Sequence, residues 1–150
     1  FLHCDRDLSG PMTGCGGRHP LPEPETLAGR LGDIGIGTTT QVVVYDDAQG
    51  MIAGRLWWLL RWLGHDAVAL LDGGLQAWQA AGGTLTDVVP TPVPRVFVAR
   101  PQDTLVKADY VLECIETPPP ATASPWPSAI RGPSTPNCGR YSPEPALPIC

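Results

Sequence analysis

The sequence has no excess of positive charge and no long apolar run. Ten Lys and Arg stand against 15 Asp and Glu in 150 residues, which gives a net charge of −5. No basic surface that could hold a nucleic-acid backbone is therefore predicted. The longest apolar run, residues 56–63, is interrupted by Arg61 and is far shorter than the roughly 18 residues that span a bilayer. We expect neither nucleic acid nor a membrane as a partner.

Paired cysteines and targeting signals are also missing. The odd number and irregular spacing of the cysteines favour isolated reduced thiols over a disulfide framework or a zinc site. We expect no metal or organic cofactor. The chain begins with Phe1, and no charged opening precedes an apolar run. We interpret it as a fragment of a larger, cytoplasmic protein. The five cysteines are Cys4, Cys15, Cys114, Cys138 and Cys150.

Composition divides the chain into zones. Residues 1–22 are rich in Gly and Pro, as loops are, whereas residues 23–88 alternate between helical and strand patterns. Residues 117–150 hold ten prolines and three charged residues, a mixture that sustains neither helix nor sheet. Closely spaced prolines after residue 89 indicate an extended connector. We predict a domain over 1–88, a linker over 89–106, and over 107–150 the remnant or atypical start of a second domain, mostly irregular.

The middle zone predicts helices alternating with strands. Prolines and acids open a helix over residues 23–32, and a β-branched run over 41–45 suits a buried parallel strand. Apolar residues at helical spacing predict a helix over 51–64. A strand over 67–71, a helix over 75–81, a strand over 96–98 and a helix over 107–116 follow. This order predicts an α/β fold, a mostly parallel sheet flanked by helices, with an irregular proline-rich tail.

The helix predicted over 51–64 is apolar on more than one side. Trp57, Trp58 and Trp62 widen its apolar surface beyond the stripe that faces its own sheet. Such a helix needs cover from a second direction, which a partner domain could supply. For the chain alone we expect an exposed apolar patch and a tendency to associate.

Several short motifs occur in the order and spacing of one family. Together they resemble the amino-terminal domain of the tandem rhodanese proteins, the thiosulfate and mercaptopyruvate sulfurtransferases. The resemblance runs from about Phe1 to Arg100 and implies a rhodanese-like domain whose start is truncated here. It also implies a second domain that supplies the catalytic cysteine, to which the tail shows no likeness. The motifs are residues 5–9, 17–22, 42–46, 55–58, 64–65, 71–74 and Trp78.

The resemblance implies nucleophilic sulfur chemistry. In the family, a cysteine thiolate takes sulfane sulfur from a small anionic donor and passes it to an acceptor. Backbone N–H groups of a strand-to-helix turn stabilise that thiolate. The corresponding turn here is residues 45–50, where Asp46 occupies the cysteine position, and a carboxylate cannot take up sulfane sulfur. Cys15 and Cys138 precede glycine and arginine as an active cysteine could, but neither follows a strand or opens a helix.

Supporting residues are also implied by the resemblance. Asp5 and His19 match an Asp and a His of the first domain that face the active cysteine in mercaptopyruvate-type members. Imidazole can move a proton near neutral pH and a carboxylate can orient it. The alternative, a turn-capping Asp and a loop His, stays open. Arg55 could bind the anionic donor or make a structural contact to the partner domain.

The resemblance therefore implies the non-catalytic half of a sulfurtransferase, inactive alone, that acts with a catalytic second rhodanese domain. The whole enzyme would move sulfane sulfur from thiosulfate or mercaptopyruvate to a thiol or cyanide. One alternative is an inert rhodanese module that binds a partner protein, which exposed tryptophans on the helix over 51–64 would favour. Another is a rhodanese-fold phosphatase or arsenate reductase. Asp46 argues against both the phosphatase and the arsenate reductase, because those enzymes also need a cysteine in this turn.

Overall fold

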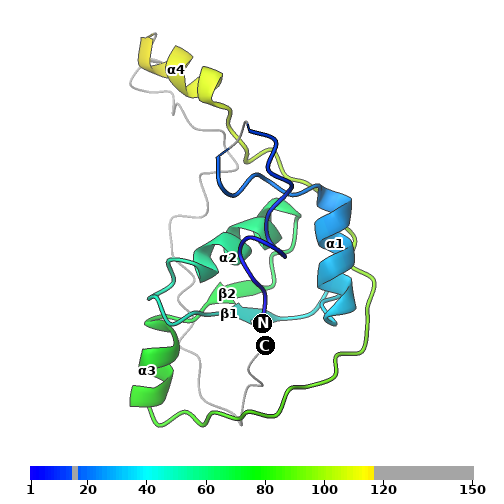
Figure 1. Cartoon of the computed structure of the whole chain (residues 1–150), viewed down its shortest axis with the longest axis vertical. Coiled ribbons are helices and arrows are strands. Elements are labelled where there is room, and N and C mark those ends of the chain that lie inside the picture. The colour runs from blue at the N-terminus through cyan, green and yellow to red at the C-terminus, as the bar shows by residue number, and fades with distance from the viewer. Residues whose placement is uncertain (15–16, 117–150) are drawn as a thin grey trace. The chain divides into compact units, whose positions relative to one another are not determined.

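The computed structural model describes residues 1–14 and 17–116. The chain divides into two compact units, of which residues 1–14 and 17–101 make up the described part of the first and residues 102–116 that of the second. The elements in chain order are α1 (Pro24–Asp33), β1 (Val42–Val44), α2 (Ala53–Trp62), β2 (Val68–Leu70), α3 (Gly74–Ala80) and α4 (Ala108–Glu116) (Figure 1). The predicted order of helices and strands over residues 23–81 is therefore confirmed.

A parallel pair of strands forms the sheet of the first unit. β1 and β2 pair in register from Val42 with Val68 to Val44 with Leu70. The pairing extends beyond the strands, because the Val42 N–H donates to Ala67 O at 2.8 Å. α2 connects the two strands and packs on both of them. The prediction of an α/β fold with a parallel sheet and flanking helices is confirmed.

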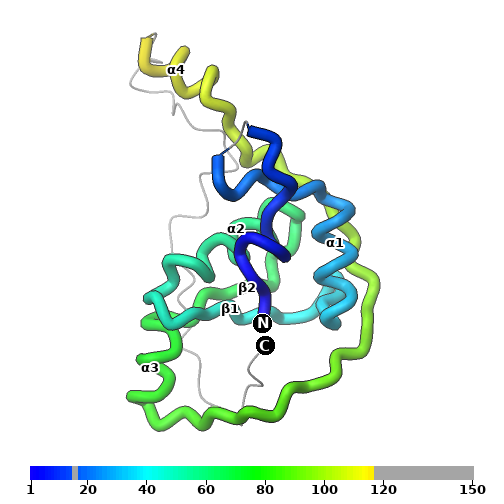
Figure 2. Tube along the Cα trace, in the orientation of Figure 1, coloured from blue at the N-terminus to red at the C-terminus, as the bar shows by residue number. Residues whose placement is uncertain are grey.

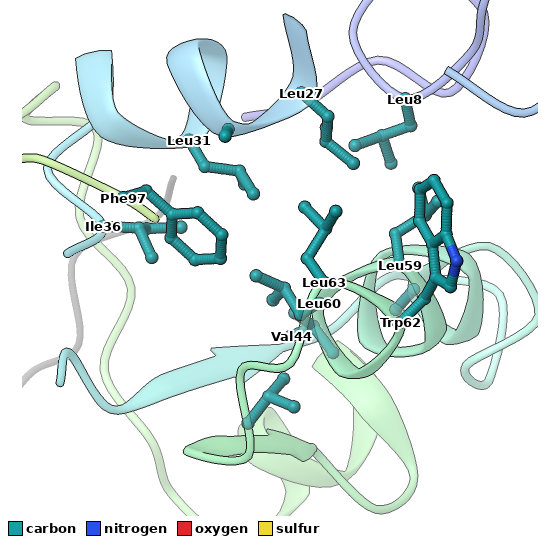
Figure 3. Packing of buried hydrophobic residues seen from close by; sticks show 13 residues of the cluster. Leu8, Leu27, Leu31, Ile36, Val44, Leu59, Leu60, Trp62, Leu63 and Phe97 are labelled. Carbon is teal, nitrogen blue, oxygen red and sulfur yellow. The ribbon is translucent and has the colours of Figure 1, made fainter. Parts of the chain in front are cut away.

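The core lies where α1 and α2 meet the sheet. Leucines of both helices point toward one another across this core (Figure 3). Burying each such side chain stabilises the fold by about 1.5–3 kcal/mol relative to leaving it exposed. The same leucines supplied the helical spacing in the sequence, so the predicted apolar faces are the ones that are buried. The fully buried side chains are Leu27, Leu31, Leu59, Leu60 and Leu63.

The tryptophans of α2 differ in their exposure to solvent. Trp62 is only 6% exposed, and Trp58 packs against the core and stacks on Trp62 with ring centroids 6.0 Å apart. Trp57 is 37% exposed, and the guanidinium of Arg61 lies 5.7 Å from the centre of its ring. The first unit thus covers two of the three tryptophans itself. The large apolar residues that stay exposed over residues 51–64 are Met51, Ile52 and Trp57.

The segment after α3 corrects one prediction. Residues 96–98 were expected to form a strand, but they are extended without pairing to a strand. Their neighbours bond to helix ends instead, since the Arg95 N–H donates to Gly32 O and the Arg100 N–H to Leu63 O, both at 2.9 Å. Figure 2 shows this segment running from α3 past α1. Phe97 between these bonds is 8% exposed and joins the core. The segment after residue 88 therefore contributes to the packing of the first unit.

The second unit contains α4, at the residues where a helix was predicted. Its apolar side chains include the exposed Leu112 and Ile115, and none of its residues is buried. The proline-rich tail over 117–150 lies outside the described residues. Over residues 1–14 and 17–116, no helix combines the length and the apolar character needed to cross a bilayer.

Candidate functional site

The turn between β1 and α2 encloses the carboxylate of Asp46. One carboxylate oxygen accepts the N–H groups of Ala48 at 2.9 Å and Gly50 at 2.7 Å. The other accepts those of Ile52 at 2.8 Å and Ala53 at 2.7 Å. The last of these opens α2, whose N-terminal end carries partial positive charge. The turn is therefore an anion cradle, and a side chain of the turn itself fills it.

The cradle keeps Asp46 ionised. Burial raises the pKa of this carboxyl group, but the four backbone hydrogen bonds favour the charged form and outweigh burial. The pKa of Asp46 therefore lies below its ordinary value. Sequence reasoning had placed Asp46 at the tip of this turn. It did not show that the N–H groups are already bonded to the carboxylate.

The glycines after β2 brace the same turn. The Leu75 N–H donates to Asp46 O at 2.9 Å, and the Gln76 side chain donates to Asp47 O. Gly74 has φ +60° and lies so close that an added Cβ would come within 2.6 Å of Asp46 O. A side chain is therefore excluded at Gly74. The predicted strand-end turn over residues 72–74 thus helps to shape the cradle.

Asp5 and His19 are in direct contact, although 14 residues separate them. His19 Nε2 lies 2.5 Å from Asp5 Oδ1. The side chains are partly open to solvent, 49% for Asp5 and 34% for His19. His3 is a third member, since its Nδ1 accepts the Asp5 N–H at 3.2 Å. Sequence reasoning selected Asp5 and His19 but missed His3, whose proximity in the chain was the only available signal.

Local hydrogen bonds form the turn that presents Asp5. The Asp7 N–H donates to His3 O at 2.8 Å, and the His3 N–H donates to Asp7 Oδ2 at 2.7 Å. A hydrogen bond from the Arg6 side chain is the main reason that the pKa of Asp7 falls to about 2. Asp7 therefore stays ionised and keeps accepting the His3 N–H. Asp7, not Asp5, is the residue that closes this turn.

Arg55 of α2 joins the segments that carry Asp5 and His19. Its guanidinium donates to Leu8 O through Nε at 3.1 Å and through one terminal nitrogen at 2.9 Å. The same terminal nitrogen contacts His19 O at 3.1 Å and Pro20 O at 3.2 Å. Donor binding or a contact to a partner domain had been expected for Arg55. The contacts found are to backbone carbonyls and to the Ser9 hydroxyl of its own unit.

The thiols considered as rivals are only partly described. Cys15 and Cys138, which resembled an active loop in sequence, lie outside the described residues. Cys4 and Cys114 are free thiols, each partly buried. Within residues 1–14 and 17–116, no group of three His, Cys, Asp or Glu side chains is placed to hold a metal ion.

The Asp46 turn, Arg55 and His19 all lie within a stretch that matches a known family. A family model described as a rhodanese-like domain matches residues 14–81. The chain carries a rhodanese-like domain. The predicted fold and the predicted resemblance to thiosulfate and mercaptopyruvate sulfurtransferases are thereby confirmed.

Relatives of this rhodanese-like domain include named sulfurtransferases. A probable 3-mercaptopyruvate sulfurtransferase of Pseudomonas aeruginosa is 49% identical over 108 residues, which are 71% of this chain and 38% of the relative. A thiosulfate sulfurtransferase of Bos taurus is 37% identical over 100 residues, or 65% of this chain and 34% of the relative. The chain thus spans 34% to 38% of the length of these two relatives.

A solved structure shows the same rhodanese fold. The crystal structure of SseA from Escherichia coli, a 3-mercaptopyruvate sulfotransferase, superimposes with a TM-score of 0.60 at 32% identity. The alignment covers 65% of this chain and 37% of SseA. The agreement supports sulfur transfer as the chemistry of the family to which this domain is related. The roles of Asp5, His19 and Asp46 stay predictions.

Proposed function

We propose that this chain is the non-catalytic half of a sulfurtransferase that moves sulfane sulfur from thiosulfate or mercaptopyruvate to a thiol or cyanide. One of the relatives is named for 3-mercaptopyruvate and the other for thiosulfate, and this chain spans little more than a third of the length of each. A catalytic second rhodanese domain would be its partner, this chain would correspond to the amino-terminal half, and the cytoplasm would be its compartment. The small anionic sulfur donor would bind where the two domains meet.

The observation that carries this proposal is the filled cradle. Persulfide chemistry needs a thiolate at the centre of converging N–H groups. Here the four N–H groups of the turn bond to the carboxylate of Asp46. A carboxylate has no sulfur with which to form a persulfide, and it also occupies the place of a donor anion. This turn therefore supports the structure and carries no reaction.

The pair Asp5 and His19 supplies what such a half can contribute. A neutral His19 that donates Nε2–H to Asp5 Oδ1 keeps Nδ1 as its basic atom. Asp5 then fixes the orientation of the ring, so that Nδ1 is the atom that can take a proton. In the complete enzyme, His19 would exchange a proton with the cysteine loop of the second domain.

An assay with thiosulfate and cyanide tests the proposal. We expect the purified chain to form thiocyanate only at the background rate, as should its Cys15→Ser and Cys138→Ser variants. Added to a separately produced catalytic rhodanese domain, the chain should raise turnover, and the His19→Ala chain should raise it less. Turnover by the chain alone that disappears in either serine variant would overturn the assignment of inactivity.

The docking module is a weaker candidate. It would use exposed tryptophans of α2 as anchors. Trp62 is buried and Trp58 packs against the core, which leaves Trp57 with its Arg61 contact. One partly exposed ring is a small anchor for a partner protein. The sulfurtransferase assignment is therefore preferred.

A further inference from the structure

Arg55 is an unusual residue at its place in the fold. It lies in the first turn of α2, where a positive side chain is opposed by the partial positive charge of the helix end. Its described acceptors are all uncharged oxygens, so no carboxylate among them offsets this repulsion. Nε and one terminal nitrogen of the guanidinium donate to backbone carbonyls, and the same terminal nitrogen contacts Ser9 Oγ at 3.3 Å. Hydrogen bonds to neutral oxygens, and not an ion pair, therefore hold this cation in place.

The acceptors of Arg55 belong to two segments that α2 alone would not bring together. Leu8 and Ser9 end the turn that carries Asp5, and Arg55 is 47 residues from Leu8 in the chain. His19 and Pro20 form the other segment, 36 and 35 residues away. A direct backbone bond also links the two segments, from the Gly10 N–H to Pro20 O at 3.0 Å. Arg55 thus links the segment that carries Asp5 to the segment that carries His19.

The planar fork of arginine suits this task. Its N–H donors point in fixed directions and can serve several oxygens at once, whereas a lysine ammonium is a single point charge on a flexible stem. Pro20 O accepts from both Arg55 and Gly10, so loss of the guanidinium leaves the Gly10 bond alone to join the segments at this carbonyl. Two residues before Arg55, the Ala53 N–H bonds to Asp46. The first turn of α2 therefore fixes both the cradle and the pair of Asp5 and His19.

We propose that Arg55 is a positioning residue. It sets the geometry of the Asp5 and His19 pair by donating hydrogen bonds to the backbone of both segments that carry the pair. These hydrogen bonds occupy its Nε and one terminal nitrogen, so the role that we assign to Arg55 is positioning rather than binding of the anionic donor. The importance of this role for sulfur transfer rests on the proposed function. The positioning itself is a property of the chain alone.

Nuclear magnetic resonance of the whole chain tests this role without any catalysis. The short contact of His19 Nε2 with Asp5 should give a downfield ring-proton signal at low temperature, and the Asp5→Asn variant identifies it by its loss. We expect Arg55→Met to abolish the signal. We also expect it to speed exchange of the Gly10 amide at least tenfold, while the Val42 amide of β1 changes less than twofold. A merely destabilising substitution would speed exchange at both amides.

Two further variants complete the test. Arg61→Met removes a cation from the exposed face of the same helix and should leave the signal and both exchange rates unchanged. Arg55→Lys keeps the charge without the fork, and we expect it to lose the signal as well. It carries the test if Arg55→Met does not fold. If either Arg55 variant keeps the downfield ring-proton signal and the slow exchange of the Gly10 amide, the proposal is overturned. If the thiocyanate assay contradicts the proposed function, the positioning role of Arg55 is not affected.

Discussion

Replacing Asp46 measures how much the filled cradle contributes to the fold. Hydrogen bonds to a charged group each contribute about 1.5–3 kcal/mol. Water reaches this partly buried turn and would replace part of what is lost, so we expect Asp46→Ala to cost about 3 kcal/mol, half of the low-end sum. For a domain of roughly 100 residues, this corresponds to a fall in melting temperature of more than about 10 °C. The loss is a large part of the 5–15 kcal/mol that holds an ordinary domain folded, so urea unfolding should detect it easily.

The asparagine variant tests the charge. Asp46→Asn keeps the shape, but its NH₂ group would face two N–H donors, so we expect a loss similar to that of Asp46→Ala. Because the folded-state pKa of Asp46 is lowered, its contribution is fully present above the unfolded value of about 4. That contribution is lost as the pH falls through the lowered pKa. The difference between the wild type and Asp46→Asn should therefore be constant from pH 5 to 7, and shrink below about pH 4.

The adjacent carboxylate provides the control. Asp47 is exposed, and its backbone carbonyl rather than its side chain takes part in the turn. Asp47→Asn should therefore unfold at nearly the urea concentration of the wild type. The acid-dependent contribution of Asp7, whose pKa is about 2, is common to all three proteins and cancels from the comparison. If Asp46→Asn and Asp47→Asn unfold at the same urea concentration at pH 7, the cradle does not stabilise the fold and the reasoning is refuted.

Further substitutions at the turn and in the core, with their controls, have expected outcomes. Asp46→Cys places a thiol among four N–H donors, so its pKa should fall below the ordinary value of about 8.5, as the pH dependence of alkylation followed by mass spectrometry would show; an ordinary pKa would contradict the cradle. Gly74→Ala forces a Cβ against Asp46 O and should cost about 1–3 kcal/mol in urea unfolding. Gly29→Ala, in α1 with open space around it, should instead stabilise by about 0.5–1 kcal/mol. Phe97→Ala should cost about 3–5 kcal/mol, and a loss no larger than that of the exposed Val96→Ala would exclude Phe97 from the core.

Much of the fold was available from local sequence pattern. The β-branched run over residues 41–45 and the helical spacing of leucines over 51–64 are short-range signals, and both elements formed within a residue or two of their predicted bounds. The presence of Asp46 directly after this β-branched run was likewise evident. Because parallel strands connected by a helix place such a residue at the helix N-terminus, its location in the turn followed from element order alone.

Contacts between distant segments were not available in this way. Asp5 and His19 were selected by motif position, yet their contact depends on two loops that Arg55 and a bond from Gly10 bring together. For Arg55, the sequence indicated only a positive side chain on a predicted helix. All but one of its acceptors are carbonyl oxygens, which every residue has and which therefore leave no mark in the side-chain pattern.

The sequence by itself determined the elements, the parallel α/β order and the acidic residue in the turn, because each depends on side chains that are neighbours in the chain. Tertiary structure alone decided that Phe97 leaves the expected strand pattern to fill the core, and that the N–H groups of the turn converge on Asp46. Both outcomes depend on where the backbone passes once the leucine core has formed. Packing sets that path, and a one-dimensional pattern does not contain it.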